Sequence, residues 1–161
     1  MPFSGPARTT TVSSVDPTRY IGTWYELGSV KQFFSVGLVN STANYSLNAD
    51  GSAIIVVNTG RYFSATGPES SVLGSAIPVD ASFARLNVSF SGTNSAQPPG
   101  NYWIVDLDPN YQWAIVSDPS GQSGFLLSRT KSVSASAYQD LLDRAAAKGV
   151  NVGAITPTPQ L

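Results

Sequence analysis

Apolar and polar residues alternate along most of the chain, a pattern typical of strands that are buried on one face. In residues 84–90, for example, Leu86, Val88 and Phe90 occupy every second position, and Asp50-Gly51 is a strong hairpin turn signal. The expected strands are residues 22–29, 40–48, 53–60, 71–77, 84–90, 101–107, 111–117 and 124–130. Eight short strands joined by tight turns predict an all-β fold, an eight-stranded up-and-down antiparallel β-barrel.

The spacing of apolar residues changes from every second position to helical spacing near the C-terminus. Apolar residues recur at helical spacing from Tyr138 to Ala145, and Gly149 is a good stop signal, so we expect one helix over residues 134–148, packed outside the barrel. Residues 1–15 are expected to form a flexible leader and residues 154–161 a flexible tail, which leaves one domain over residues 16–153. No run of about 18 apolar residues exists, so no membrane-spanning helix is expected.

Composition narrows the chemistry. The 161 residues carry a net charge of −1, which gives no reason to expect a nucleic-acid partner. The chain has no Cys and no His, which excludes disulfides, a Cys nucleophile, a His base and a His-ligated zinc or haem within these residues. It also excludes a lipid anchor on one of its own cysteines. We therefore expect a protein that is not an enzyme and that needs neither metal nor cofactor.

Four blocks carry a resemblance to a known family: residues 19–27, which include Gly22-Thr23-Trp24, and residues 43–47, 111–116 and 126–130. In this order and spacing they resemble the lipocalins, and in particular the branch of bacterial lipocalins and apolipoprotein D, over residues 16–152. The resemblance implies a calyx closed at its base by Gly22, Trp24 and Arg129. A guanidinium stacks well on an indole ring, so we expect Arg129 to lie over Trp24.

In a barrel of this size the inward side chains decide the ligand. Alternation and the resemblance together place Ala43, Leu47 and Ala114 inside, with these candidate ligand contacts: Glu26, Tyr45, Val56, Asn58, Leu86, Val88, Phe90, Val116 and Phe125. In residues 101–107 either Tyr102 and Ile104 face the cavity, and join this set, or Trp103 and Val105 do.

Three of these positions carry more specific expectations. Tyr45 and Asn58 are polar groups on an apolar face, and the resemblance puts similar positions in the ligand pocket of apolipoprotein-D-type lipocalins. Glu26 is expected either to make a structural hydrogen bond or to anchor a ligand head group.

The leading hypothesis is a carrier of a small hydrophobic or amphiphilic molecule, of the fatty acid or lysophospholipid type. A tetrapyrrole or haem bound without His, through Tyr45 or Tyr102, is an alternative. Residues 33–39 are unusually apolar for a loop. We expect Phe33, Phe34 and Leu38 there to form either a lid over the cavity entrance or a surface that contacts a membrane or a second copy of the chain. Apart from such a contact, we expect the protein to be a monomer. The resemblance favours a secreted or periplasmic protein.

Overall fold

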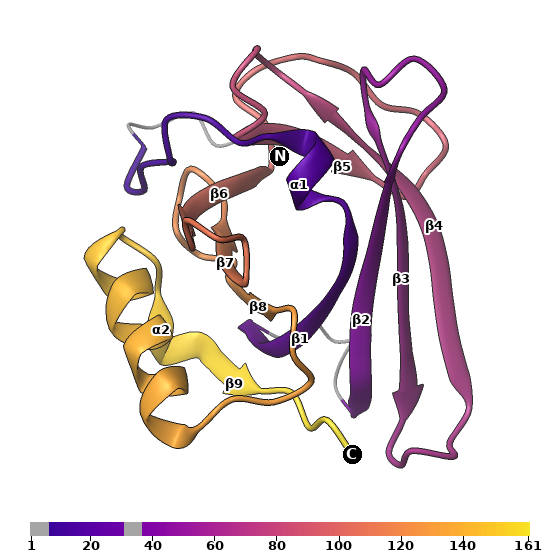
Figure 1. Cartoon of the computed structure of the whole chain (residues 1–161), viewed down its shortest axis with the longest axis vertical. Coiled ribbons are helices and arrows are strands. Elements are labelled where there is room, and N and C mark those ends of the chain that lie inside the picture. The colour runs from indigo at the N-terminus through magenta and orange to yellow at the C-terminus, as the bar shows by residue number, and fades with distance from the viewer. Residues whose placement is uncertain (1–6, 31–36) are drawn as a thin grey trace.

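The computed structural model describes residues 7–30 and 37–161 (Figure 1). A short helix α1 (Pro17–Tyr20) precedes the strands, and a longer helix α2 (Ala135–Ala147) follows them. The strands are β1 (Gly22–Val30), β2 (Leu38–Leu47), β3 (Ile54–Tyr62), β4 (Glu69–Pro78), β5 (Arg85–Ser89), β6 (Tyr102–Leu107), β7 (Trp113–Ser117), β8 (Phe125–Ser128) and β9 (Ile155–Pro157), with a 3₁₀ turn at Val152–Ala154 before β9.

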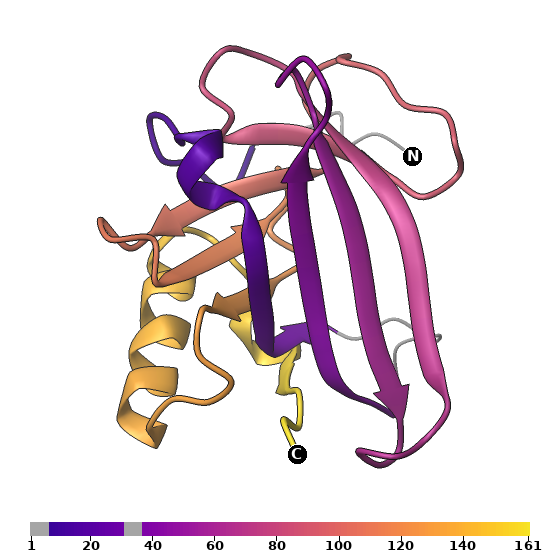
Figure 2. The ribbon, with the colours of Figure 1, turned by 45° about the vertical axis from the view of Figure 1, so that its right-hand side comes forward.

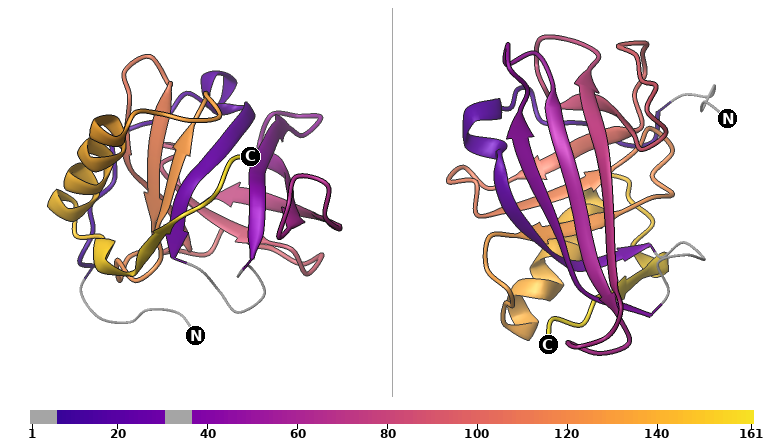
Figure 3. Two further views of the ribbon diagram at one scale, coloured as in Figure 1. Left: turned by 90° about the horizontal axis from the view of Figure 1, so that it is seen from below. Right: turned by 90° about the vertical axis from the view of Figure 1, so that its right-hand side faces the viewer.

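Each strand from β1 to β7 pairs antiparallel with the next, and β8 pairs back with β1. The expected eight-stranded up-and-down barrel is therefore confirmed. Figure 2 shows β2, β3 and β4 as one long wall, while α2 lies outside the barrel beside the shorter strands β6 to β8 (Figure 3). Among the described residues, no helix is both long and apolar enough to cross a membrane.

Strand alternation divides the buried side chains into two cores. One fills part of the barrel interior and includes Trp24, Val56 and Leu86. The other lies between the barrel and α2, and there Leu141 and Ala145 of the helix pack on the outer face of the strands. In β6, Tyr102 and Ile104 belong to the inner core and Trp103 and Val105 to the outer one. Of the two alternatives left open by the sequence, it is therefore Tyr102 and Ile104 that face the barrel interior.

The C-terminal segment differs from the flexible tail expected at residues 154–161. β1 pairs with β2 only from Gly22 to Tyr25, so the second half of β1 has a free edge, and β9 pairs with it from Gly28 to Val30. Beyond β9, the backbone N–H of Thr158 donates to the carbonyl of Leu27 at 2.9 Å. This correction has a simple cause, because backbone groups at an open strand edge need partners.

The described part of the leader is also packed against the barrel. The N–H of Arg8 donates to the carbonyl of Pro119 at 2.8 Å, and that of Val12 to the carbonyl of Ile104 at 3.0 Å. Val15 is buried in the inner core. Residues 7–15 thus cover one end of the barrel rather than extending freely from it.

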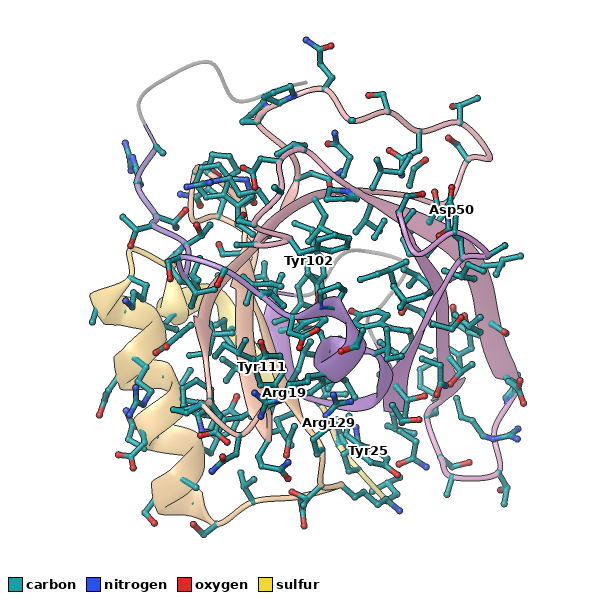
Figure 4. All side chains as sticks on the ribbon, turned by 45° about the horizontal axis from the view of Figure 1, so that its top comes forward. Arg19, Tyr25, Asp50, Tyr102, Tyr111 and Arg129 are labelled. Carbon is teal, nitrogen blue, oxygen red and sulfur yellow. The ribbon has the colours of Figure 1, made fainter. Side chains whose placement is uncertain are left out.

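Arg129 connects the elements at the α1 end of the barrel (Figure 4). Its guanidinium carbon lies 3.7 Å from the centre of the Trp24 ring. The guanidinium donates to the carbonyls of Arg19 (2.8 Å), Ile21 (3.0 Å), Thr23 (3.0 Å) and Tyr111 (3.1 Å). Gly22 has φ +105°, and a Cβ there would lie 3.2 Å from Nη1 of Arg129, so both its backbone conformation and the space around it favour glycine.

Replacing Arg129 tests this closure. Arg129→Met keeps the aliphatic stem but leaves carbonyls of α1 and β1 without their donor, and we expect the free energy of unfolding to fall by about 3 kcal/mol in urea denaturation. Arg85→Met is the matched control, because Arg85 also lies over a tryptophan (Trp103, 5.2 Å) but on the surface. We expect it to cost less than about 1 kcal/mol. Equal stability of Arg129→Met and the unmodified protein would contradict a structural role for this side chain.

Candidate ligand cavity

A cavity of about 1170 Å³ occupies the barrel interior that the inner core leaves open. Its wall is built by strands β1 to β6 and β8, with loop residues between β5 and β6 and between β7 and β8. Period-two alternation explains the choice of residues: on β3, for example, Ile54, Val56 and Asn58 line the cavity. The volume is ample for one ligand of drug or lipid size.

Most of the candidate contacts lie in this wall. They are Glu26, Leu38, Tyr45, Val56, Asn58, Leu86, Val88, Phe90, Tyr102 and Phe125. Whether each touches a ligand stays a prediction. Phe33 and Phe34 lie outside the described residues, and Gly22, Trp24 and Arg129 lie at the closed end, away from the wall.

Two candidates are placed differently from expectation. Ile104 and Val116 face the interior but do not line the cavity; they are fully buried in the inner core. The reason is that the leader crosses this end of the barrel, where Val12 bonds to the Ile104 backbone and Val15 joins the same core. The interior is therefore solid at one end and hollow at the other.

Sequence reasoning missed Tyr20, which α1 carries into the cavity wall. Asp16 caps this helix by accepting from the N–H of Thr18 at 3.0 Å, and Pro17 follows at the first helical position. The carbonyl of Tyr20 accepts from Nε1 of Trp24 at 2.8 Å, which holds the two residues together. The signal was present in the sequence, since a tyrosine precedes the Gly-x-Trp motif by two positions.

Tyr20, Tyr45 and Tyr102 form what we call the tyrosine triad. The hydroxyl oxygen of Tyr102 lies 2.7 Å from that of Tyr20 and 3.0 Å from that of Tyr45. The Tyr20 and Tyr45 rings stack with centroids 5.7 Å apart, and the Tyr102 ring meets Tyr45 edge-on. Figure 4 shows Tyr102 within the ring of strands. All three side chains line the cavity.

The triad is uncharged at physiological pH. Burial raises the pKa of Tyr45 to about 12. Burial likewise raises the pKa values of Tyr20 and Tyr102 well above the ordinary value of 10.0. Both neighbouring tyrosines add to the rise at Tyr102, whereas at Tyr20 the hydrogen bond with Tyr102 opposes it. A phenolate in this place would lose its hydration, and at Tyr20 the opposing influence of the Arg129 charge is smaller than the effect of burial.

The described part of the wall contains two carboxylates, Glu26 and Asp118. Glu26 accepts hydrogen bonds from the hydroxyls of Ser29 (3.2 Å) and Thr158. Burial opposes ionisation of Asp118, but hydrogen bonds from Ser120 and Ser123 lower its pKa below the ordinary value. Among the described residues, neither a Lys nor an Arg lines the cavity, and no cluster of acidic residues has the make-up of a metal site.

Asn58 adds one polar group to the apolar wall. Its neighbours across the sheet are Ala43 on β2 and Val72 on β4. Its side-chain oxygen is buried and has no hydrogen-bond partner among the described residues. A buried acceptor of this kind favours a ligand or water that can donate to it.

Comparison with known proteins supports what the geometry indicates. The family model of the lipocalin-like domain matches residues 15–160. The chain belongs to the lipocalin family. This confirms the resemblance found in the sequence, and lipocalins are proteins that bind and transport small hydrophobic molecules, not enzymes.

Individual relatives are similar to this chain over most of their length. Temperature-induced lipocalin-1 of Arabidopsis thaliana is 31% identical over 160 residues, which cover 92% of this chain and 81% of the relative. Outer membrane lipoprotein Blc of Escherichia coli (strain K12) is 36% identical over 148 residues, which cover 91% and 80%. The crystal structure of the cockroach allergen Per a 4 superposes with a TM-score of 0.67 at 19% identity, over 94% of this chain and 92% of that one, and so shares the fold.

The shifted tyrosines predict how stability depends on pH. The unfolded chain loses the Tyr45 proton near pH 10, whereas the folded protein keeps it to about pH 12, so the folded state binds more protons in this interval and loses stability as pH rises through it. For Tyr45 alone, the free energy of unfolding should fall by about 2 kcal/mol from pH 9 to pH 12.

Urea denaturation at stepped pH measures this fall, and Tyr45→Phe should reduce its slope. Ultraviolet absorbance of tyrosinate, compared between the two proteins, reports the titration of Tyr45 directly. Ionisation of Tyr45 near pH 10 in the folded protein would contradict the prediction.

Proposed function

We propose that this lipocalin binds and carries one amphiphile with a long hydrocarbon chain, of the class that includes fatty acids and lysophospholipids, inside its barrel. The observation that carries the proposal is the 1170 Å³ cavity, whose wall is mostly aliphatic and aromatic. Transfer of apolar ligand surface from water into such a cavity contributes roughly 25 cal/mol per Å², so no covalent step is needed.

The wall supports a chain-like ligand in particular. Val56 on β3, Val72 on β4, and Leu86 and Val88 on β5 give three adjacent strands a continuous set of apolar side chains in the wall, and polar groups such as Asn58 and the triad lie among them. A hydrocarbon chain can lie along such a wall with its polar parts at these points. Specificity then rests on a few positioned polar groups, as in most small-molecule sites.

The haem alternative is less well supported. A tyrosine binds ferric iron as its phenolate, as in catalase. Tyr45 and Tyr102 are instead held in the neutral form by burial, which raises both pKa values. Each is also engaged in the triad.

For cellular location we propose a secreted or periplasmic protein, because the Escherichia coli relative is an outer membrane lipoprotein. Contact with a membrane surface or a second copy through residues 33–39 stays a prediction. Most of that segment lies outside the described residues, and Leu38 lines the cavity at the start of β2.

Two adjacent positions on β4 test whether the ligand occupies the cavity. Val72 lines it and its side chain is 45% exposed, whereas Leu73 points outward and is 68% exposed. A tryptophan at position 72 therefore takes up ligand space without displacing packed core atoms. We expect Val72→Trp to weaken binding of an alkyl-chain fluorescent probe about fivefold or more, and Leu73→Trp to leave it unchanged. Fluorescence titration measures both, and equal affinities in the two variants would contradict a ligand site inside the barrel.

A further inference from the structure

The hydroxyl protons of the triad can be counted. Three hydroxyl groups carry three protons, and two oxygen–oxygen contacts join them, at 2.7 Å and 3.0 Å. Each contact uses one proton. Among the described residues, no other group hydrogen-bonds to these three oxygens. In every arrangement of the protons, therefore, one hydroxyl donor has no acceptor among residues 7–30 and 37–161.

This free donor belongs to the cavity. Tyr20 and Tyr45 are buried and Tyr102 is partly accessible, and all three contribute to the wall. A buried donor without an acceptor costs free energy, so water takes the place of an acceptor until a ligand displaces it. The group that replaces this water without loss has an oxygen lone pair.

The charge of the wall determines which oxygen fits. The described lining includes two carboxylates, Glu26 and Asp118, and no cationic side chain. A ligand carboxylate at the triad would give up its hydration for one donated proton, and no cationic side chain of the described lining would pair with it. The raised pKa values keep the triad itself neutral. A carbonyl, ester or alcohol oxygen accepts the proton without this penalty.

We propose that the tyrosine triad binds an uncharged acceptor oxygen on the inner part of the ligand, so that this lipocalin selects neutral oxygenated alkyl compounds over alkyl carboxylates at that place. The inference rests on the proposed function and narrows it. A ligand that also carries a charged group keeps that group away from the triad.

Three ligands of equal chain length separate the two proposals: decane, 2-decanone and decanoate at pH 8, each displacing an alkyl-chain fluorescent probe. We expect 2-decanone to bind about tenfold more tightly than decanoate, because decanoate either places an unpaired carboxylate at the triad or keeps the carboxylate away and leaves the free hydroxyl donor without an acceptor. If none of the three displaces the probe, the proposed function fails. If decanoate binds as tightly as 2-decanone, only the present inference fails.

The triple variant Tyr20→Phe/Tyr45→Phe/Tyr102→Phe removes every hydroxyl of the triad while keeping the rings. A single substitution is not enough, because the remaining tyrosines still offer a free proton. We expect the triple variant to bind 2-decanone about fivefold more weakly and decane no more weakly. Tyr25→Phe is the control, since Tyr25 lies between inward-facing Trp24 and Glu26 on β1 and is not part of the wall. Equal affinity of the triple variant and the unmodified protein for 2-decanone would overturn the inference.

Loss of decane binding as well would show that the triple variant is misfolded. A measurement on the unmodified protein then decides. The infrared stretch of 2-decanone labelled with ¹³C at the carbonyl should move to lower wavenumber on binding, relative to the same compound in alkane, because the carbonyl accepts a hydrogen bond. An unshifted band would overturn the inference.

Discussion

The stacking of Arg129 on Trp24 is the interaction on which the barrel depends. One guanidinium, just after the last barrel strand, binds carbonyls of α1 and β1 and covers the indole that fills the closed end. It thereby joins the first strand, the last strand and the entry helix at one point. Tyr20 takes its place in the cavity wall from the same helix, so the closure of the barrel also positions part of the ligand site.

The hollow in the barrel follows from how its interior is filled. At the end crossed by the leader, Ile104 and Val116 are buried in the inner core, Val15 lies at the border between this core and the cavity, and beyond it the inward side chains face open space. The helix α2 takes no part in this, because it packs on the outer face against Trp103 and Val105. The C-terminal strand β9 protects the edge of β1 that β2 leaves open. Residues such as Tyr20, Val56 and Leu86 contribute both to stability and to the ligand space, because they belong to the inner core and also line the cavity.

The chemistry of the cavity is that of a binding site in which apolar surface predominates and polar groups lie among the apolar side chains. Apolar surface supplies affinity for any hydrocarbon chain, while the neutral triad and the Asn58 oxygen are the points at which one ligand can be told from another. Membership of the lipocalin family accounts for the affinity for hydrocarbon chains. Discrimination between ligands comes from this chain's own side chains, because it depends on three particular hydroxyls and on the absence of a cation from the described wall.

The sequence by itself determined the barrel, its closing residues and the absence of Cys and His chemistry, because alternation and motif are local properties of the chain. It left the orientation of β6 open, since both alternating sets there are apolar: one faces the cavity and the other α2. It did not predict β9, a short strand ending in proline that exists only because β1 has a free edge. Only the tertiary structure brought Tyr20, Tyr45 and Tyr102 together, since hydrogen bonds between residues so far apart along the chain form only once the barrel has closed.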